Sequence, residues 1–539
     1  MPRLLRFVAS AALLVSVATL LSRLVGFGRL LVFSPSVGAG AIGTAYQSAN
    51  QVPNILYEVI AGGALAGAVV PLLAGPLARA DTATASRIAS ALLTWSVSLT
   101  LPLAVLIVVF REQIAGAVLD HESEVAYGAG FLLMFAPQLV LYAIGGVLTG
   151  VLQAHRRFLW PAFMPLVSSL IVIGVYVGYA RLRGPEVATE DPAALALLGW
   201  GTTAGVVALA LPLALPTLRT GLRIRSAWRF PAGVAARAVR LAAAGMTVLL
   251  AQQAATLMIM VVSNNVGGTG VFVVFSYIQA VYLLPYAVLA IPVATVAFPR
   301  LSELAASART RSTEPSLPED VDAAIAKTSR LVLALGFAGA ALLIAAATPL
   351  EDFFSTRDAA SGDSPELFAA LGDAVRVIAW AVPGWCFVAW GTRVFYALER
   401  SRTAAIATAV GWSAVALSVV AGIPLVGEDP APRTLVLLGA AHVIGMTLAA
   451  AGLIGGILRV RGRASAAGIP RTLVVASVGA VLGAAVGSLT ASSLGTVVGT
   501  SSAAAVAAGA TGGTAALVVV LAVVALADRG TLAHVRGLR

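Results

Sequence analysis

The chain has 539 residues, of which 59% are hydrophobic and only 11% are charged, and its formal net charge is +11 at pH 7. Soluble domains carry about 25% charged residues, so this composition excludes an ordinary soluble protein and indicates a membrane protein. The single cysteine, Cys386, excludes an intrachain disulfide framework and a cysteine-based metal site.

Apolar runs long enough to cross a bilayer recur along the whole chain. Arg3 and Arg6 precede the first run, as in a signal peptide, but the run continues past any cleavage site, so we interpret it as a retained helix. The sequence therefore predicts an all-α, polytopic integral membrane protein with about fourteen transmembrane helices. The predicted spans are 7–33, 43–75, 88–110, 125–153, 160–181, 194–217, 234–264, 269–299, 327–349, 370–398, 403–425, 434–458, 472–492 and 503–527.

The loop charges alternate in sign from one predicted side of the membrane to the other. Arginines gather on one side, for example Arg156 and Arg157, whereas acidic residues such as Asp120 and Glu122 gather on the opposite side. Cytoplasmic loops of membrane proteins carry the excess of basic residues. With an even number of helices, this pattern predicts a multi-pass membrane protein with both termini in the cytoplasm. The positive net charge is thus a topology signal and does not indicate nucleic-acid binding.

A faint internal repeat divides the chain. The end of the second predicted span, Val70-Pro71-Leu72, is similar to Phe298-Pro299-Arg300 at the end of the eighth. Two six-helix halves in the same orientation are typical of a transporter that binds its substrate between the halves; chance similarity in an apolar sequence is the alternative. We predict an N-terminal lobe at 1–218, a basic amphipathic linker at 219–240 on the cytoplasmic surface, a C-terminal lobe at 241–460, and two further helices with a short basic tail at 461–539.

The residues that most enzymes need are missing. No pair of the histidines at 121, 155, 442 and 534 has metal-ligand spacing. The only lysine, Lys327, follows Ala326, so no phosphate-binding loop of the GxxxxGK type is present, and no GxSxG motif occurs. We therefore predict a transporter without a metal or cofactor and not an enzyme.

The first predicted helix carries two arginines, Arg23 and Arg29, at or near membrane depth. A charge there costs about 2.5–3.5 kcal/mol, so it normally faces a cavity or a partner. Gly26 and Gly28 lie between them and favour a break that could turn both arginines toward one cavity. A guanidinium group matches the oxygens of a phosphate, which predicts an anion-binding cavity.

The second predicted helix adds polar groups to this cavity. Pro53 removes a backbone hydrogen bond and favours a kink, next to Asn54 as a candidate ligand-binding residue. Glu58 could pair with an arginine of the first helix in the empty state, and Arg393 in the tenth helix is a weaker candidate. The alternative is that the arginines extend to the cytoplasmic interface and Glu58 only neutralises one of them.

Several motifs resemble the MurJ (MviN) family, the lipid II flippases of the multidrug/oligosaccharidyl-lipid/polysaccharide exporter superfamily. The similar segments are Ser22-Arg23-Leu24-Val25-Gly26-Phe27-Gly28-Arg29, Gly38-Ala39-Gly40, Val52-Pro53-Asn54-Ile55-Leu56, Gly63-Ala64, Val70-Pro71-Leu72, Arg156-Arg157-Phe158, Pro161-Ala162-Phe163 and Phe395-Tyr396-Ala397. The resemblance implies two six-helix lobes, two C-terminal helices beside a groove for a polyprenyl tail, and alternating access. It also implies that Arg23 and Arg29 bind the pyrophosphate of a lipid-linked muropeptide.

Besides an inverted charge around Tyr57-Glu58, the chain departs from this family at four places. Leu30 and Thr44 stand where the family tends to have acidic residues, and so does Gly62. Gln279-Ala280 aligns with an Asp-Arg pair of the family, which removes a cavity arginine from the second lobe. The chain could therefore carry a different lipid-linked glycan.

Three hypotheses follow. The first is a flippase that moves a polyprenyl-pyrophosphate-linked cell-wall precursor, lipid II or a relative, to the outer leaflet for peptidoglycan synthesis. The second is a non-transporting membrane scaffold derived from a flippase, with cell-wall synthesis or division proteins as partners. The third, a cation-coupled drug exporter, has only Glu58 as an intramembrane carboxylate.

Overall fold

A computed structural model describes residues 2–59, 67–183, 191–310, 318–358, 365–498 and 501–532. These residues form helices and no strands, which confirms the all-α prediction. Thirteen of the helices in these ranges are long and apolar enough to cross a membrane. The remaining predicted span, 43–75, corresponds to two shorter helices separated by residues outside the described ranges. The chain divides into two compact units, Met1–Gln253 and Ala254–Arg539.

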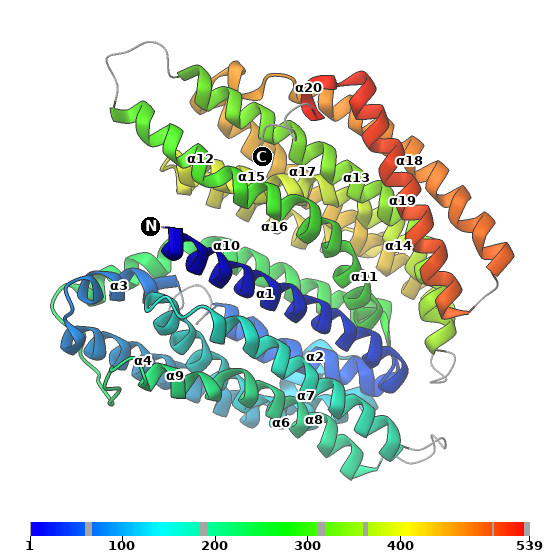
Figure 1. The fold of residues 1–539 in the computed structure, drawn as a ribbon. Coiled ribbons are helices and arrows are strands. Elements are labelled where there is room, and N and C mark those ends of the chain that lie inside the picture. Colours follow the sequence, from blue (N-terminus) through cyan, green and yellow to red (C-terminus); the bar gives the residue numbers. More distant parts are fainter. Residues whose placement is uncertain are drawn as a thin grey trace. The chain divides into compact units, whose positions relative to one another are not determined.

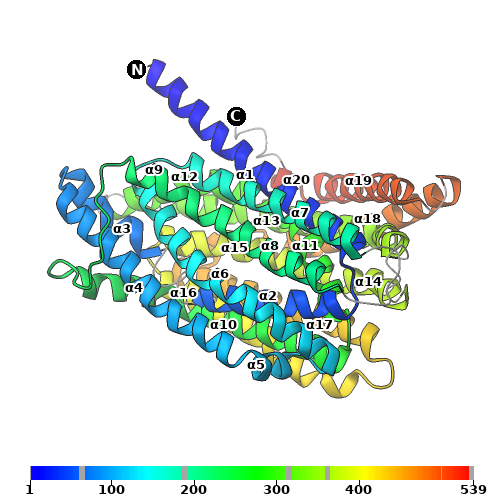
Figure 2. The ribbon, with the colours of Figure 1, turned by 90° about the horizontal axis from the view of Figure 1, so that it is seen from below.

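Unit 1 is a bundle of helices joined mostly by short turns (Figure 1). The first half of α1 extends beyond the other helices of this unit (Figure 2). Closest packing occurs between α1 and α7, α7 and α8, α2 and α6, and α4 and α6. The helices are α1 (Pro2–Ser36), α2 (Ala41–Tyr57), α3 (Gly67–Ala78), α4 (Thr82–Val109), α5 (Arg111–Val118), α6 (Glu122–Ala154), α7 (Leu159–Arg183), α8 (Pro192–Ala210), the short 3₁₀ turn η2 (Leu211–Leu213), α9 (Ala214–Leu218) and α10 (Val234–Val262), which continues into unit 2.

Small residues allow the helices of unit 1 to approach closely. A Cβ atom at Gly150 of α6 would lie 2.6 Å from the Cβ of Val69 on α3, so only glycine fits there. Val69 belongs to a fully buried apolar cluster that joins α3, α4 and α6, with Leu72, Ile88 and Val151 among its members. Helix α6 belongs both to this cluster and to the lining of the polar hollow described below.

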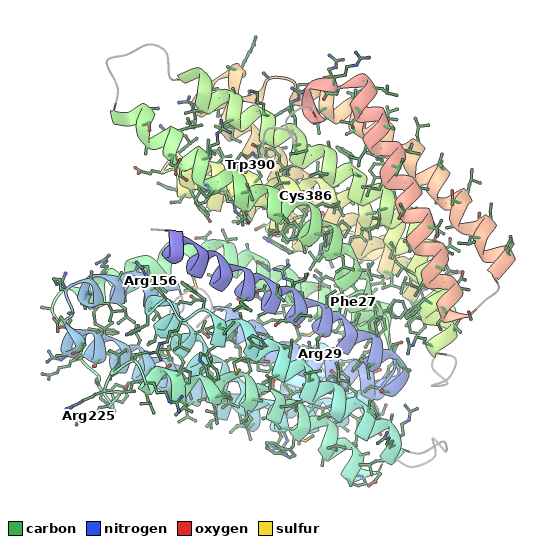
Figure 3. All side chains as sticks on the ribbon, in the orientation of Figure 1. Phe27, Arg29, Arg156, Arg225, Cys386 and Trp390 are labelled. Atoms are coloured by element: carbon green, nitrogen blue, oxygen red, sulfur yellow. The ribbon has the colours of Figure 1, made fainter. Side chains whose placement is uncertain are left out.

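The predicted linker contains an extended segment, residues 222–230, between α9 and α10. Leu222 is buried in the apolar cluster, whereas Arg223 and Arg225 are exposed, which is the two-residue alternation of an extended chain. Its backbone N–H groups bond to hydroxyls of α4, each at 3.0 Å: Arg223 to Ser86, Arg225 to Ser90 and Ala227 to Thr94. We call residues 222–230 the strap. Near its end, the ring of Trp228 packs on that of Trp95 with centroids 5.6 Å apart. Figure 3 labels Arg225 on it.

Unit 2 contains the remaining helices, and two of the predicted spans are each built from successive helical segments. Residues 269–299 contain α11, the wide turn η4 and part of α12; residues 370–398 contain most of α14, the tight turn η5 and α15. The elements are η3 (Ser263–Gly267), α11 (Val271–Pro285), η4 (Tyr286–Ala290), α12 (Ile291–Thr310), α13 (Pro318–Asp358), α14 (Pro365–Ile378), η5 (Ala379–Ala381), α15 (Val382–Ala397), α16 (Ser401–Ala421), η6 (Ile423–Leu425), α17 (Pro430–Arg461), η7 (Arg463–Ala466), α18 (Ile469–Val498), α19 (Ser502–Ala527) and α20 (Arg529–Leu532).

The last two long helices, α18 and α19, pack against each other and against α13 (Figure 1). Their shared core is made of small side chains, including Ala338, Ala480 and Ala516. A cluster of polar side chains lies at one end of α13, α18 and α19. Arg330 of α13 forms an ion pair with Asp528, whose side chain is 3% exposed.

Burial alone would raise the pKa of the Asp528 carboxyl. Hydrogen bonds donated by Thr472 and Thr531, at 2.5 and 2.7 Å, and the charge of Arg330 outweigh it, so the pKa is lowered. The ionised carboxylate therefore joins α13, α18 and the turn before α20.

Candidate functional site

A polar hollow lies inside unit 1, with a volume of about 90 Å³. It is bounded by α1, α2, α6, α7 and α8, which are the helices that the compact packing of this unit brings together. The lining residues are Gly26, Arg29, Leu30, Phe33, Tyr46, Gln47, Asn50, Tyr142, Ser168, Val172, Tyr176, Thr202 and Val206. The lining contains one cation and no acidic side chain.

Three hydroxyl groups form the floor of the hollow. The Tyr46 hydroxyl lies 2.8 Å from that of Thr202 and 3.0 Å from that of Tyr176, and all three residues are buried. Thr202 also donates to the Leu198 carbonyl of its own helix at 2.7 Å. The network joins α2, α7 and α8, because each helix contributes one hydroxyl.

Aromatic rings hold the Tyr46 side chain in place. Its ring packs at centroid distances of 5.6 Å from Phe33, 5.5 Å from Phe131 and 5.4 Å from Phe135. The contacts with Phe131 and Phe135 are edge-to-face, the arrangement that aromatic pairs prefer. Hydroxyl groups held among packed aromatic rings suit a polar ligand that needs hydrogen-bond partners.

Arg29 supplies the charge of the hollow. It lies on α1 (Figure 3), its side chain is exposed, and within the described ranges it forms no ion pair. Asn50 adds a buried side-chain oxygen that has no hydrogen-bond partner among the described residues. An unpaired guanidinium beside hydroxyl and amide groups is suited to binding an anion such as a phosphate.

The other predicted site residues lie outside this hollow. Arg23 is exposed on α1 and does not line it. Asn54 donates to the Asn50 carbonyl of its own helix at 2.9 Å, and Glu58 is half-buried without an ion pair to either arginine. Arg393, in unit 2, donates to the Ala389 carbonyl at 2.7 Å. The structure thus brings Arg29, but not Arg23, Asn54 or Glu58, to one site within unit 1.

The predicted break in the first helix is wrong for this structure. Helix α1 runs without interruption through Gly26 and Gly28 (Figure 3), and Pro53 lies inside a continuous α2. A glycine in a helix interior costs only about 1 kcal/mol relative to alanine. In a bilayer, breaking the backbone hydrogen bonds costs more, so the helix persists. Arg23 and Arg29 therefore keep the angular offset of a regular helix.

The four family departures have different environments. Leu30 lines the hollow beside Arg29, and Thr44 is fully buried in α2. Ala280 is half-buried on α11, in unit 2. Gly62, like the motif Gly63-Ala64, lies outside the described residues.

Unit 2 contains a separate hollow of about 250 Å³ between α12, α13 and α15. Arg300 and Lys327 line it together with apolar side chains, and the buried Trp390 (Figure 3) forms part of its wall. Of the described residues, no group of three or more His, Cys, Asp or Glu side chains could hold a metal ion.

Sequence reasoning missed the hydroxyl floor. Tyr46, Gln47 and Asn50 recur at three- and four-residue spacing, which places them on one face of α2. That spacing was a usable signal for a polar face. Nothing in one sequence pairs this face with Tyr176 and Thr202, which are more than a hundred residues away.

The chain is similar to proteins of one described family. The family described as "Lipid II flippase MurJ" matches residues 33–412. A "Probable lipid II flippase MurJ" of Rhizobium meliloti is 26% identical over 413 residues, covering 72% of this chain and 70% of that protein. One from Synechocystis sp. is 28% identical over 42% of this chain and 43% of that protein, and the "Lipid II flippase MurJ" of Burkholderia cenocepacia is 27% identical over 54% and 57%. The chain thus spans less than two thirds of the latter two relatives.

Solved structures show the same fold. The structure titled "Lipid II flippase MurJ, inward closed conformation" superposes with a TM-score of 0.71 at 18% identity, covering 96% of this chain and 99% of that one. An inward-facing multidrug resistance MATE family transporter of the MOP superfamily gives 0.64 at 13% identity, covering 81% and 94%. At these identities the similarity establishes the fold alone.

Proposed function

Because this chain belongs to the MurJ family, we propose that it is a flippase for a polyprenyl-pyrophosphate-linked cell-wall precursor, lipid II or a close relative. It moves the precursor from the inner to the outer leaflet by alternating access and so serves peptidoglycan synthesis. The observation that carries this proposal is the unpaired Arg29 beside the hydroxyl floor of an acid-free hollow. A hollow of about 90 Å³ holds a phosphate group and not a whole muropeptide, so it suits one end of the cargo.

The proposal includes an orientation and a division of the chain. Both termini lie in the cytoplasm of a bacterial cell, because the arginine-rich loops then face inward. We retain the division into lobes at 1–218 and 241–460, the linker at 219–240 and the C-terminal helices at 461–539. The lipid-linked precursor is the proposed substrate, and cell-wall synthesis or division proteins are the proposed protein partners.

Substitution of Arg29 tests the site. A hydrogen bond to a charged group contributes about 1.5–3 kcal/mol, which corresponds to a roughly 10- to 100-fold loss of affinity. We expect Arg29→Ala to lose labelled lipid II by this factor in nanodisc binding and native mass spectrometry. Arg29→Lys should bind with intermediate affinity, because it keeps the charge and loses the planar fork. Arg87→Ala, an exposed arginine of α4 outside the hollow, is the matched control.

Two results would contradict the proposal at different levels. Unchanged binding by Arg29→Ala would remove the hollow as the phosphate site. A wild-type protein that neither binds nor translocates lipid II in proteoliposomes would remove the flippase function itself. In that case the membrane scaffold, which needs no cargo, would be the better account.

A further inference from the structure

A single histidine lies at the centre of a membrane-spanning helix in unit 2. His442 is on α17, and it is 1% exposed. It follows the first residue of the helix, Pro430, by twelve positions, which is about 18 Å at the rise of an α-helix and hence near the middle of a bilayer core of about 30 Å. Ionisable side chains at this depth are rare and mark ion or proton pathways.

The hydrogen bonding of the ring fixes where a proton could bind. Nδ1 lies 2.8 Å from the Leu438 carbonyl, which can only accept, so Nδ1 carries the hydrogen. The other nitrogen, Nε2, then has a free lone pair. It is buried and has no hydrogen-bond partner among the described residues. A buried acceptor without a partner is costly and calls for a functional explanation.

Aromatic rings surround the buried ring of His442. Ring centroids lie 5.5 Å away for Phe275, 6.2 Å for Trp412 and 6.3 Å for Tyr282. Trp385 extends this group by packing edge-to-face on Trp412 at 5.5 Å. The surround is therefore largely apolar, and such a surround favours the neutral imidazole.

More unpartnered polar atoms accompany the ring. The Tyr282 hydroxyl and the Trp385 indole N–H are buried without a partner within the described ranges. So are the hydroxyls of Ser263, on η3, and Thr434, at the start of α17. Unpartnered polar atoms therefore occur from the Pro430 end of α17 to its centre. In the proposed orientation that end faces the outside, because Arg459 and Arg461 occupy the other end.

The titratable groups on the elements around α17 determine whether any charge faces His442. The elements packed against α17 are α11, α14, α15, α16, η3, η5 and η7. Their titratable groups with described side chains are Tyr277, Tyr282, Asp373, Arg376, Cys386, Arg393, Tyr396, Arg402 and Arg463, and α17 itself adds Arg433, Arg459 and Arg461. Asp373 pairs with Arg376 at 2.5 Å, and none of the described charged groups forms an ion pair with His442.

We infer that His442 is a proton-binding site that couples this protein to the proton gradient. A proton arriving from the outer side binds the Nε2 lone pair and converts the ring to an imidazolium. An apolar, buried surround disfavours that charge, so the protonated ring favours a different packing of α17 against α11 and α16. Proton binding and conformation are then linked, which is what a coupled transporter requires. Proton binding by His442 does not depend on the proposed function, whereas the use of that proton to drive lipid transport rests on it.

Proton binding is tested first, without any lipid cargo. A protonated imidazole quenches indole emission on contact, and Trp412 contacts His442. Purified wild-type protein in nanodiscs should lose part of its tryptophan emission reversibly between pH 8 and pH 5. The loss should be absent from His442→Gln and from His442→Phe, which keeps a ring of similar size. His155→Gln is the matched control, because His155 makes the same 2.8 Å Nδ1 bond to a carbonyl one turn earlier, but outside the membrane core.

Transport is the second measurement. In proteoliposomes with labelled lipid II, an inward proton gradient of about one unit should shift the distribution of lipid about tenfold if one proton moves per lipid. Both His442 variants should lose this response, and His155→Gln should keep it. The inference is overturned if the wild type shows no fluorescence step, or if the step or the gradient response persists in the variants. If the wild type translocates no lipid, the proposed function fails, and the fluorescence arm alone decides whether His442 binds the proton.

Discussion

Removal of one hydroxyl from the floor of the hollow is the sharpest test of the site geometry. Tyr46→Phe deletes two hydrogen bonds, at 2.8 and 3.0 Å, and leaves the ring and its aromatic neighbours in place. Thr202 keeps its bond to the Leu198 carbonyl, so only the Tyr176 hydroxyl loses its partner. A neutral hydrogen bond contributes about 0.5–1.5 kcal/mol, and a stranded buried group costs about 1–3 kcal/mol. The two ranges together predict that the free energy of unfolding falls by about 1.5–4.5 kcal/mol.

The measurement is thermal unfolding of the purified protein in detergent, with lipid II binding as a second readout. Tyr57→Phe is the matched control, because Tyr57 also lies on α2 and packs on Tyr142 at 5.1 Å, but its hydroxyl makes no described hydrogen bond. Tyr46→Phe should unfold at a clearly lower temperature than Tyr57→Phe. A double variant with Tyr176→Phe should recover part of the loss, since both partners are then removed together. Equal unfolding temperatures for the Tyr46 and Tyr57 variants would refute the hydroxyl network.

Two further predictions concern the ion pair of Asp528 and the strap. Asp528→Asn should lower stability by about 3 kcal/mol at neutral pH, because Arg330 would lose its buried partner. The pKa of Asp528 is lowered in the folded protein, so its contribution to stability is complete above the unfolded pKa of about 3.9 and is lost as the pH falls below that value. In a pH series, the difference in unfolding temperature between wild type and variant should therefore shrink only below that pH. Ser90→Ala should release the strap, because the Ser90 hydroxyl accepts the Arg225 N–H, and trypsin should then cleave residues 223–229 faster. Ser96→Ala, which removes a hydroxyl bonded only within α4, should not change the cleavage rate, and equal rates for both variants would contradict the strap.

The fold was largely predictable because bilayer crossing imposes a strong, local signal. Length and hydropathy alone predict most of the spans, since a helix must satisfy its own backbone in lipid. Departures arise where a span is not one regular helix. Pro285 precedes the wide turn η4, and Pro383 follows the tight turn η5, so single predicted spans became successive segments. The strap was also not predictable as an extended chain, because its partner hydroxyls are on α4, more than a hundred residues earlier.

Of the candidate site in unit 1, only the positive charge could be predicted from the sequence. A guanidinium in an apolar helix is conspicuous in a sequence, and Arg29 was found for that reason. Its distinction from Arg23 depends on which face of an unbroken α1 meets α7, a tertiary fact. The floor is a contact between Tyr46, Tyr176 and Thr202, and tyrosine and threonine are common in membrane helices, so neither residue type is a signal alone.

The departure at Leu30 has a consequence for Arg29. Both residues line the hollow, and an acidic side chain at position 30 would place a carboxylate beside the guanidinium. Such a pair would neutralise the cation and compete with an anionic ligand. With leucine there, no carboxylate at position 30 competes for Arg29, so under the proposed function its attraction to a pyrophosphate is greater. Stronger binding in one state slows release, so under the proposed function an input of free energy that favours the releasing state would speed the cycle. A proton bound at His442, in the other unit, would supply that input without placing a second charge in the hollow.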